Sequence, residues 1–129
     1  MATPYTLKKL TDVKDSAVEF GLSDYQEARF AGGDLDAQDT GVALERLKPN
    51  QRSPFGHVHE KAEEIYVVLS GSGRAKLDDD IIDLSPMDAL RVAPTVTRAF
   101  EADDDGLELL AFGPSHKQDG ETIMGWWSD

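Results

Sequence analysis

The chain has 129 residues, of which 40% are hydrophobic and 8% aromatic, and it contains no cysteine. A chain of this length and hydrophobic content can form a single domain with a real core, which excludes wholesale disorder. Its 25 acidic residues against 13 basic ones give a net charge of -12, which repels phosphate backbones and anionic membranes. We therefore expect neither nucleic acid nor a membrane as a partner, and we interpret the charge as a source of solubility.

The sequence also contains features that bear on the cellular compartment of the protein. The absence of cysteine excludes disulfides and thiolate chemistry. No uninterrupted apolar run approaches the length of a membrane span, and the N-terminal segment lacks the basic, apolar and small-residue sections of a signal peptide. We expect a cytoplasmic protein.

Residues 1–41 are predicted to form an N-terminal extension that packs on the main domain. A short helix is expected within residues 7–20, with Asp12 as its N-cap, although the helical signal is weak. Residues 25–31 alternate between apolar and polar positions as a strand does, and residues 32–41 are rich in Gly and Asp, as a loop is.

Short apolar or alternating runs recur from residue 42 to residue 113, separated by turn residues. Many short strands in one small domain predict an all-β barrel or sandwich. The expected strands cover residues 42–48, 57–59, 64–70, 74–77, 81–84, 89–93, 97–102 and 107–113, and the expected turns cover residues 71–73, 78–80, 85–86, 94–95 and 103–106.

Residues 114–129 are predicted to be a C-terminal tail. It contains His116, which we leave out of the candidate site because a lone His among Ser, Lys, Gln and Asp is usually solvated. The adjacent Trp126 and Trp127 present a large apolar surface at the chain end. Such a pair usually packs across the barrel or against a second subunit, so we expect packing here.

The stretch 57–71 combines metal-ligand side chains with a strong strand signal. Alternate residues of a strand share a face, so the spacing of His57 and His59 sends both imidazoles to one side. The polar run 60–63 predicts a turn, after which Glu64 begins the next strand. Two imidazoles and a carboxylate are therefore expected to converge at one point.

These residues resemble the first motif of the cupin superfamily. That motif reads Gly, five residues, His-x-His, three or four residues, Glu, six residues, Gly. The chain has Gln51 in place of the opening glycine, and we expect Pro49-Asn50 to make the same turn because Asn tolerates a positive φ. The other positions of the motif are occupied by His57, His59, Glu64 and Gly71.

The second cupin motif reads Gly, five residues, Pro-x-Gly, two residues, His, three residues, Asn, and aligns from Met87 onward. Each of its defining residues is replaced, so that the usual fourth metal ligand is an arginine. The replacements are Met87, Ala93, Thr95, Arg98 and Ala102. The resemblance covers approximately residues 42–113 and implies a small single-domain cupin with a double-stranded β-helix, or jelly-roll, barrel.

Two imidazoles and one carboxylate form the donor set of the facial triad, which suits Fe(II) and also accommodates Mn, Ni or Zn. Nitrogen donors argue against Ca or Mg. We therefore expect His57, His59 and Glu64 to bind a divalent transition metal. The alternative is that the histidines are ordinary polar residues at the mouth of a barrel.

Arg98 leaves three arrangements open. A guanidinium has no lone pair to donate to a metal, so it either pairs with Glu64 in the cation's place, points away, or stands beside the metal and binds a ligand carboxylate. If Arg98 points inward, alternation sends Phe100 the same way, while Tyr66 adds an aromatic wall with a polar tip. Arg91 faces either the same cavity or solvent. The candidate ligand-binding residues are Arg98, Tyr66, Phe100 and Arg91.

The cupins that the chain resembles include dioxygenases, isomerases, decarboxylases and non-catalytic binders. The resemblance therefore implies a site for a small anionic or polar molecule without naming a reaction or catalytic residues. An enzyme of this kind would be a metal-dependent oxygenase, isomerase or lyase. The alternative is a metal-free binding or dimerising module in which Arg98 pairs with Glu64. We also expect a homodimer, since outer apolar strand faces, here Ile65, Val67 and Leu69, are commonly covered in that way in the family.

Overall fold

The computed structural model describes residues 4–115 and 119–128, so His116 lies outside the described residues. None of the described helices is long and apolar enough to cross a membrane. The elements in chain order are η1 (Leu10–Asp12), α1 (Ser16–Glu19), β1 (Gln26–Phe30), β2 (Thr40–Leu47), β3 (Phe55–His59), β4 (Glu64–Leu77), β5 (Asp80–Leu84), β6 (Ala89–Val92), β7 (Arg98–Pro114) and β8 (Gly120–Met124).

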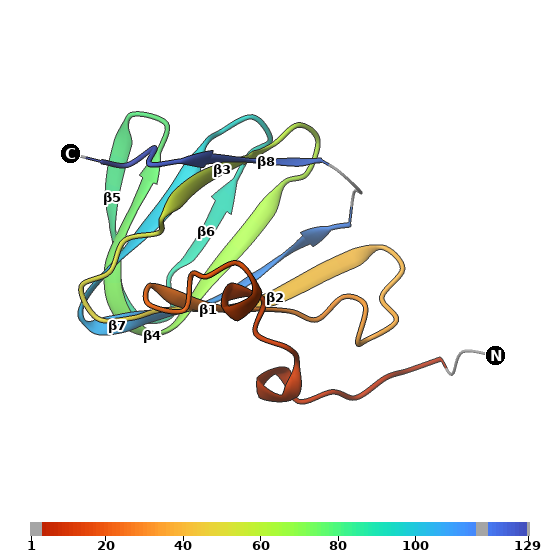
Figure 1. The fold of residues 1–129 in the computed structure, drawn as a ribbon. Helices are drawn as coiled ribbons and strands as arrows, with labels where there is room; N and C mark the ends of the chain where they lie inside the picture. The colour runs from red at the N-terminus through yellow and green to blue at the C-terminus, as the bar shows by residue number, and fades with distance from the viewer. Residues whose placement is uncertain (1–3, 116–118, 129) are drawn as a thin grey trace.

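The strands form one curled sheet, as the alternating sequence predicts (Figure 1). Neighbours follow the order β1-β2-β7-β3-β8, and β4 pairs with β7 while also carrying β5 and β6. Every pairing between these strands is antiparallel. The curl brings β3 and the start of β4 together at one end of the sheet, and this end carries the candidate site.

Two of the predicted turns are wrong. Residues 71–73 lie inside β4 and residues 103–106 lie inside β7, so each pair of expected short strands is one long strand. The glycines bend these strands without ending them. The register between β4 and β7 shifts between Gly71 and Gly73, and both Gly71 and Gly106 have positive φ angles, of 78° and 79°. A bulge with glycine in this conformation increases the local twist and leaves the pairing intact on either side.

The remaining turn predictions are confirmed. Turns separate β4 from β5, β5 from β6, and β6 from β7 at the expected positions. Asn50 adopts a φ of 62°, so an asparagine does make the turn ahead of the His-x-His strand. The predicted strands of residues 25–31 and 42–48 appear as β1 and β2 with shifts of one or two residues at their ends.

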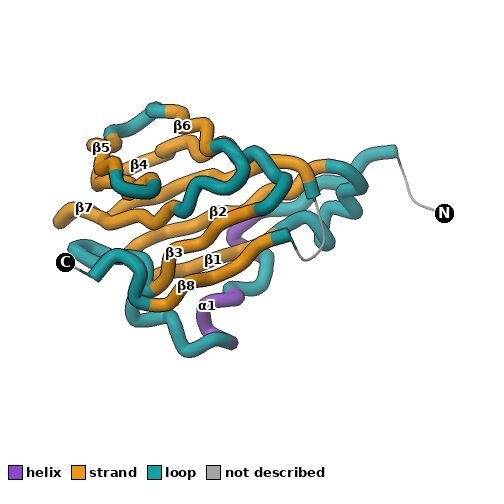
Figure 2. The backbone as a smooth tube through the Cα atoms, turned by 90° about the horizontal axis from the view of Figure 1, so that it is seen from above, coloured by secondary structure: helices purple, strands orange, loops and turns teal. Residues whose placement is uncertain are grey.

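The predicted N-terminal helix is much shorter than residues 7–20. Asp12 is not its N-cap, because α1 begins after Asp15, whose side chain accepts a hydrogen bond from the backbone N–H of Ala17. The same carboxylate oxygen of Asp15 accepts from the backbone N–H of Ala28 in β1. This shared acceptor ties α1 against the outer strand, where Figure 2 shows it. Gly21, two residues after the end of the helix, has a φ of 69°.

The segment predicted as a tail contributes a strand. β8 pairs with β3 along its whole length, from Phe55 opposite Met124 to His59 opposite Gly120. Beyond β8, Trp127 is buried beneath the guanidinium of Arg52, which lies 4.4 Å from its ring centroid. The tryptophan therefore packs within this chain.

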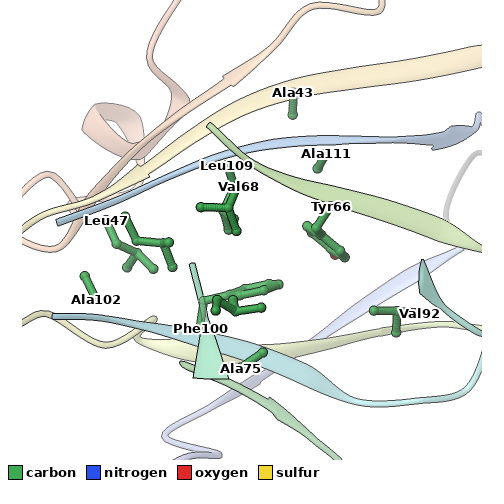
Figure 3. Packing of buried hydrophobic residues seen from close by; sticks show 12 residues of the cluster. Ala43, Leu47, Tyr66, Val68, Ala75, Val92, Phe100, Ala102, Leu109 and Ala111 are labelled. Atoms are coloured by element: carbon green, nitrogen blue, oxygen red, sulfur yellow. The ribbon is translucent and has the colours of Figure 1, made fainter. Parts of the chain in front are cut away.

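The core lies between the two sides of the curled sheet (Figure 3). On β4 the side chains of Tyr66 and Val68 are buried, while Leu69 is 41% exposed, which confirms the predicted alternation. The rings of Tyr66 and Phe100 lie 4.8 Å apart between centroids. Alternation along β4 therefore aims Tyr66 inward, on the same side as Glu64.

Candidate metal centre and ligand cleft

The structure brings together the three side chains that the sequence predicts to converge. β3 ends with His57 and His59 on the same face, and Glu64 is the first residue of β4. Each residue offers one ligand atom, and these atoms lie within 4.8 Å of one another. The short turn between the strands makes this convergence possible, because it returns the chain beside the histidines after four residues.

Glu64 is the centre of the cluster. Its Oε1 lies 3.3 Å from Nε2 of His57 and 3.3 Å from Nε2 of His59. The same oxygen accepts a hydrogen bond of 2.6 Å from the hydroxyl of Tyr66. Burial alone would raise the pKa of Glu64, but the hydrogen bonds from His57 and Tyr66 lower it to about 2. The carboxylate is therefore ionised at neutral pH, in the form that a metal ion requires.

Tyr66 keeps its proton in this environment. Burial and the neighbouring charge of Glu64 raise the pKa of the phenol well above its ordinary value. The hydroxyl therefore remains a donor to Glu64 at neutral pH. It also lies 3.3 Å from Nε2 of His57, so it touches two members of the cluster.

His59 has a carboxylate behind it. Its Nδ1 lies 3.5 Å from Oδ2 of Asp119, a residue whose side chain is almost fully buried. Asp119 also accepts hydrogen bonds from the backbone N–H groups of Glu60, Lys61 and Ala62, and these hold the β3–β4 turn in place. Burial lowers the pKa of His59, so its ring is favoured in the neutral form that can donate a lone pair. Asp119 could not be identified from the sequence, because nothing in its spacing links it to the His-x-His motif.

Arg98 occupies the position opposite His57 in the register of β3 and β7. Its side chain is fully buried, and its Nη2 lies 3.8 Å from Oε1 of Glu64. Among the described residues, none accepts a hydrogen bond from the guanidinium nitrogens of Arg98. This geometry matches the first of the three arrangements considered for Arg98, in which it lies against Glu64 as an ion pair.

A cleft of about 840 Å³ adjoins the cluster, and its lining includes His57, His59, Glu64 and Tyr66. Arg98 and Phe100 do not line it, but line a neighbouring cavity of about 40 Å³. Arg91 lies outside both, with its side chain 63% exposed and its Nη1 3.4 Å from Oε2 of Glu63. Of the four candidate ligand-binding residues, the structure therefore places only Tyr66 on the large cleft.

Glu45 is a second residue that the sequence analysis missed. It lies on β2 between Ala43 and Leu47, which belong to the core cluster, so alternation turns its side chain to the inner face of the sheet. It lines both the cleft and the small cavity. Burial raises the pKa of Glu45, while the neighbouring His57 lowers it and Glu64 raises it. Its position inside an otherwise apolar alternation was the available signal.

The donor set fits a divalent transition metal. Two imidazole nitrogens and a carboxylate oxygen converge, and the Asp119 carboxylate faces the ring nitrogen of His59 that points away from the cluster. A carboxylate in that place favours the tautomer in which Nδ1 carries the proton and Nε2 is free to bind a metal. Arg98 is the one adverse feature, because a cation near the centre lowers the affinity for another.

Comparisons with known proteins agree with this architecture. The family model of the cupin domain matches residues 43–112. No curated protein matches the chain. Among solved structures, a cupin protein from Bacteroides fragilis is similar over 91% of this chain and 89% of its own, with 24% identity and a TM-score of 0.72.

Two further solved structures share the fold at lower identity. Oxalate decarboxylase from Bacillus subtilis matches 94% of this chain with 19% identity and a TM-score of 0.75, and the match spans 33% of the decarboxylase. A variant of the Streptomyces protein PAC13, solved with uridine, matches 77% of this chain and 78% of its own, with 15% identity and a TM-score of 0.63. The jelly-roll barrel expected from the sequence is thereby confirmed.

Proposed function

Because the chain belongs to the cupin family, we propose that it binds a divalent transition metal through His57, His59 and Glu64 and holds a small molecule in the adjoining cleft. The observation that carries this proposal is the convergence of the three ligand atoms within 4.8 Å of one another at the end of that cleft. The reaction, if there is one, stays unassigned.

The protein's own residues prepare the site in three ways. Tyr66 donates to Glu64 and so keeps the carboxylate ionised and oriented. Asp119 places a carboxylate oxygen 3.5 Å from Nδ1 of His59. The apolar walls of the cleft exclude water from whatever molecule lies against the cluster. A bound Fe, Mn, Ni or Zn would supply Lewis acidity or, for a redox-active metal, oxygen activation.

A second function is favoured by the position of Arg98. Its guanidinium lies at ion-pair distance from Glu64, so it already supplies a positive charge beside the carboxylate. In this alternative the protein is a metal-free binding module, and the cluster only positions polar groups at the end of the cleft. The two functions differ in whether the purified protein carries a metal.

The metal content of the purified protein distinguishes the metal-binding function from the metal-free one. The full chain, purified without an affinity tag, should contain close to one transition metal per chain by mass spectrometry, and His57→Ala and His59→Ala should lose it. Glu64→Gln keeps the shape of the side chain but removes its charge, so it should also lose most of the metal.

The matched control is Glu63→Gln, since Glu63 is the exposed neighbour of Glu64 in sequence and pairs with Arg91. It should retain the wild-type metal content. A metal content far below one per chain that is unaffected by the histidine substitutions would instead support the metal-free alternative.

A further inference from the structure

The lining of the cleft has an uneven charge. Among the described residues that line it, none is Lys or Arg, whereas Glu45, Glu64 and Glu121 are all present. The buried cation, Arg98, opens onto the separate small cavity. In the metal-free protein, a ligand in the large cleft therefore meets carboxylates and no compensating cation from the described lining.

The walls of the cleft are apolar and partly aromatic. The apolar lining includes Phe20 just after α1, Phe30 on β1, Phe55 on β3, Phe112 on β7 and Met124 on β8. The His-His-Glu cluster and Tyr66 add polar groups to this lining. A volume of about 840 Å³ is in the range of sites that hold a drug-sized molecule.

We infer that the metal-free cleft binds an uncharged small molecule with a largely apolar body, whose hydroxyl or carbonyl oxygen reaches the His-His-Glu cluster, and that the ionised form of Glu45 acts against anionic ligands. An anion would lie beside carboxylates within apolar walls, where like charges repel more strongly than in water. Phosphorylated molecules are therefore poor ligands. This inference rests on the proposed small-molecule function of the cleft but does not require the metal.

Glu45 is suited to this role by its place between the two cavities. On β2 it is the only charged residue among the inward-facing positions 43, 45 and 47, and no hydrogen bond from an Arg or Lys neutralises it among the described interactions. It lines both the large cleft and the small cavity that Arg98 lines. Glu45 is thus a specificity-determining residue, separate from the three ligand residues.

A matched pair of probes tests the inference. Naphthol and naphthyl phosphate share one aromatic body and differ in charge at the oxygen. Calorimetric titration of the full chain after treatment with a chelator should show naphthol binding at least about tenfold more tightly than naphthyl phosphate. Equal binding, a preference for the phosphate, or no binding of naphthol in this metal-free form would overturn the inference. Metal analysis of the same samples before that treatment decides the metal centre independently.

Single substitutions show which residues cause the preference for naphthol over naphthyl phosphate. Glu45→Gln keeps the size of the side chain and should raise the affinity for naphthyl phosphate about fivefold, with naphthol changed less than about twofold. Glu63→Gln removes the same charge outside the cleft and should change neither affinity. Phe30→Ala, at a residue that is 58% exposed and so tolerant of substitution, should weaken naphthol binding severalfold. An unchanged phosphate affinity in Glu45→Gln would overturn the role of Glu45.

One other occupant of the cleft is a second copy of the chain. If a second copy filled the cleft, naphthol binding would weaken as the protein concentration rises, and sedimentation would show the probe dissociating a dimer. Either result would overturn the inference. Binding that is independent of protein concentration supports it.

Discussion

Oδ2 of Asp119 lies 3.5 Å from Nδ1 of His59, although the two residues are far apart in the sequence. The pairing of β3 with β8 brings them together, because it sets His59 opposite Gly120. Space beside the ring is limited at Gly120, since a Cβ atom there would lie 3.2 Å from the ring of His59. Asp119 and Gly120 therefore lie on one side of the His59 ring, while Nε2 of that ring faces the cluster.

Asp119→Asn should weaken metal binding by about 10- to 100-fold, the usual effect of removing the carboxylate behind a metal-bound imidazole. The reason is tautomeric: without the carboxylate, the proton of His59 is no longer favoured on Nδ1. Metal titration measures the affinity, and the ring nitrogen shifts in NMR spectra of the metal-free protein report the tautomer directly.

The control for this variant is Glu60→Gln, which removes an equal charge from the same turn, at an exposed residue. It should leave both the affinity and the tautomer unchanged. If Asp119→Asn lowered the melting temperature but left the ring nitrogens and the metal affinity as in the wild type, Asp119 would support only the turn.

Tyr66→Phe removes the hydroxyl that donates to Glu64 over 2.6 Å. The loss of a hydrogen bond to a charged group should raise the pKa of Glu64 and destabilise the protein by about 1.5–3 kcal/mol. Chemical denaturation measures the stability, and carbon-detected NMR of the carboxyl group measures the titration. A pKa of Glu64 that stays at its wild-type value would show that the hydroxyl does not act on this carboxylate.

Arg98→His should raise metal affinity, because it replaces a buried cation with an imidazole at the position that faces His57. Metal titration compares the variant with the wild type. Arg98→Met serves as the control, since it removes the charge without adding a ligand and should raise the affinity less. Equal or weaker binding in Arg98→His would show that this position does not reach the metal.

The fold was largely predictable because hydrophobic alternation and turn residues act locally. Asn50 makes the expected turn, and the alternation of Tyr66, Val68 and Leu69 fixes which face of β4 is buried. The long strands were not predictable in the same way. Gly71 and Gly106 in an isolated sequence resemble turn residues, and only pairing with a partner strand distinguishes a bulge from a turn.

The site, like the fold, has parts that the sequence predicts and parts that it does not. His57, His59 and Glu64 are joined by a short turn, so their spacing alone predicts that they meet. Asp119 reaches the cluster through strand pairing across a long stretch of chain, so no sequence spacing links it to the histidines. Glu45 lies on a strand paired with β7, and only its place among apolar inward-facing residues could have indicated it. Arg98 was predicted from a motif position, but whether it contacts Glu64 depended on a rotamer that no sequence pattern specifies.

The substitution Glu101→Gln should make the free energy of unfolding depend less on pH in the acidic range. Burial alone would raise the pKa of Glu101, but hydrogen bonds from Arg74 and Arg52 lower it below its ordinary value. A depressed carboxyl pKa stabilises the folded state above the ordinary pKa, and this contribution is lost as pH falls through the folded value. The variant should lose about 1 kcal/mol at neutral pH and lose less on acidification than the wild type.

Urea denaturation at a series of pH values measures this effect. Asp104→Asn, on the same strand at an exposed position, is the control and should follow the wild-type profile. A Glu101→Gln profile parallel to that of the wild type at every pH would show that the two arginines do not stabilise the ionised carboxylate.

Gly73→Ala tests whether the close approach of β4 and β7 depends on glycine. A Cβ atom at this position would lie 2.0 Å from the backbone oxygen of Glu101, and a backbone atom in a paired strand cannot move aside without breaking the sheet. The expected loss of stability is about 2–3 kcal/mol. Gly33→Ala is the matched control, because nothing lies within 4 Å of its Cβ position, and it should change stability by less than about 0.5 kcal/mol. Chemical denaturation of both variants measures the difference, and equal stabilities would mean that the two strands can separate at the bulge without cost.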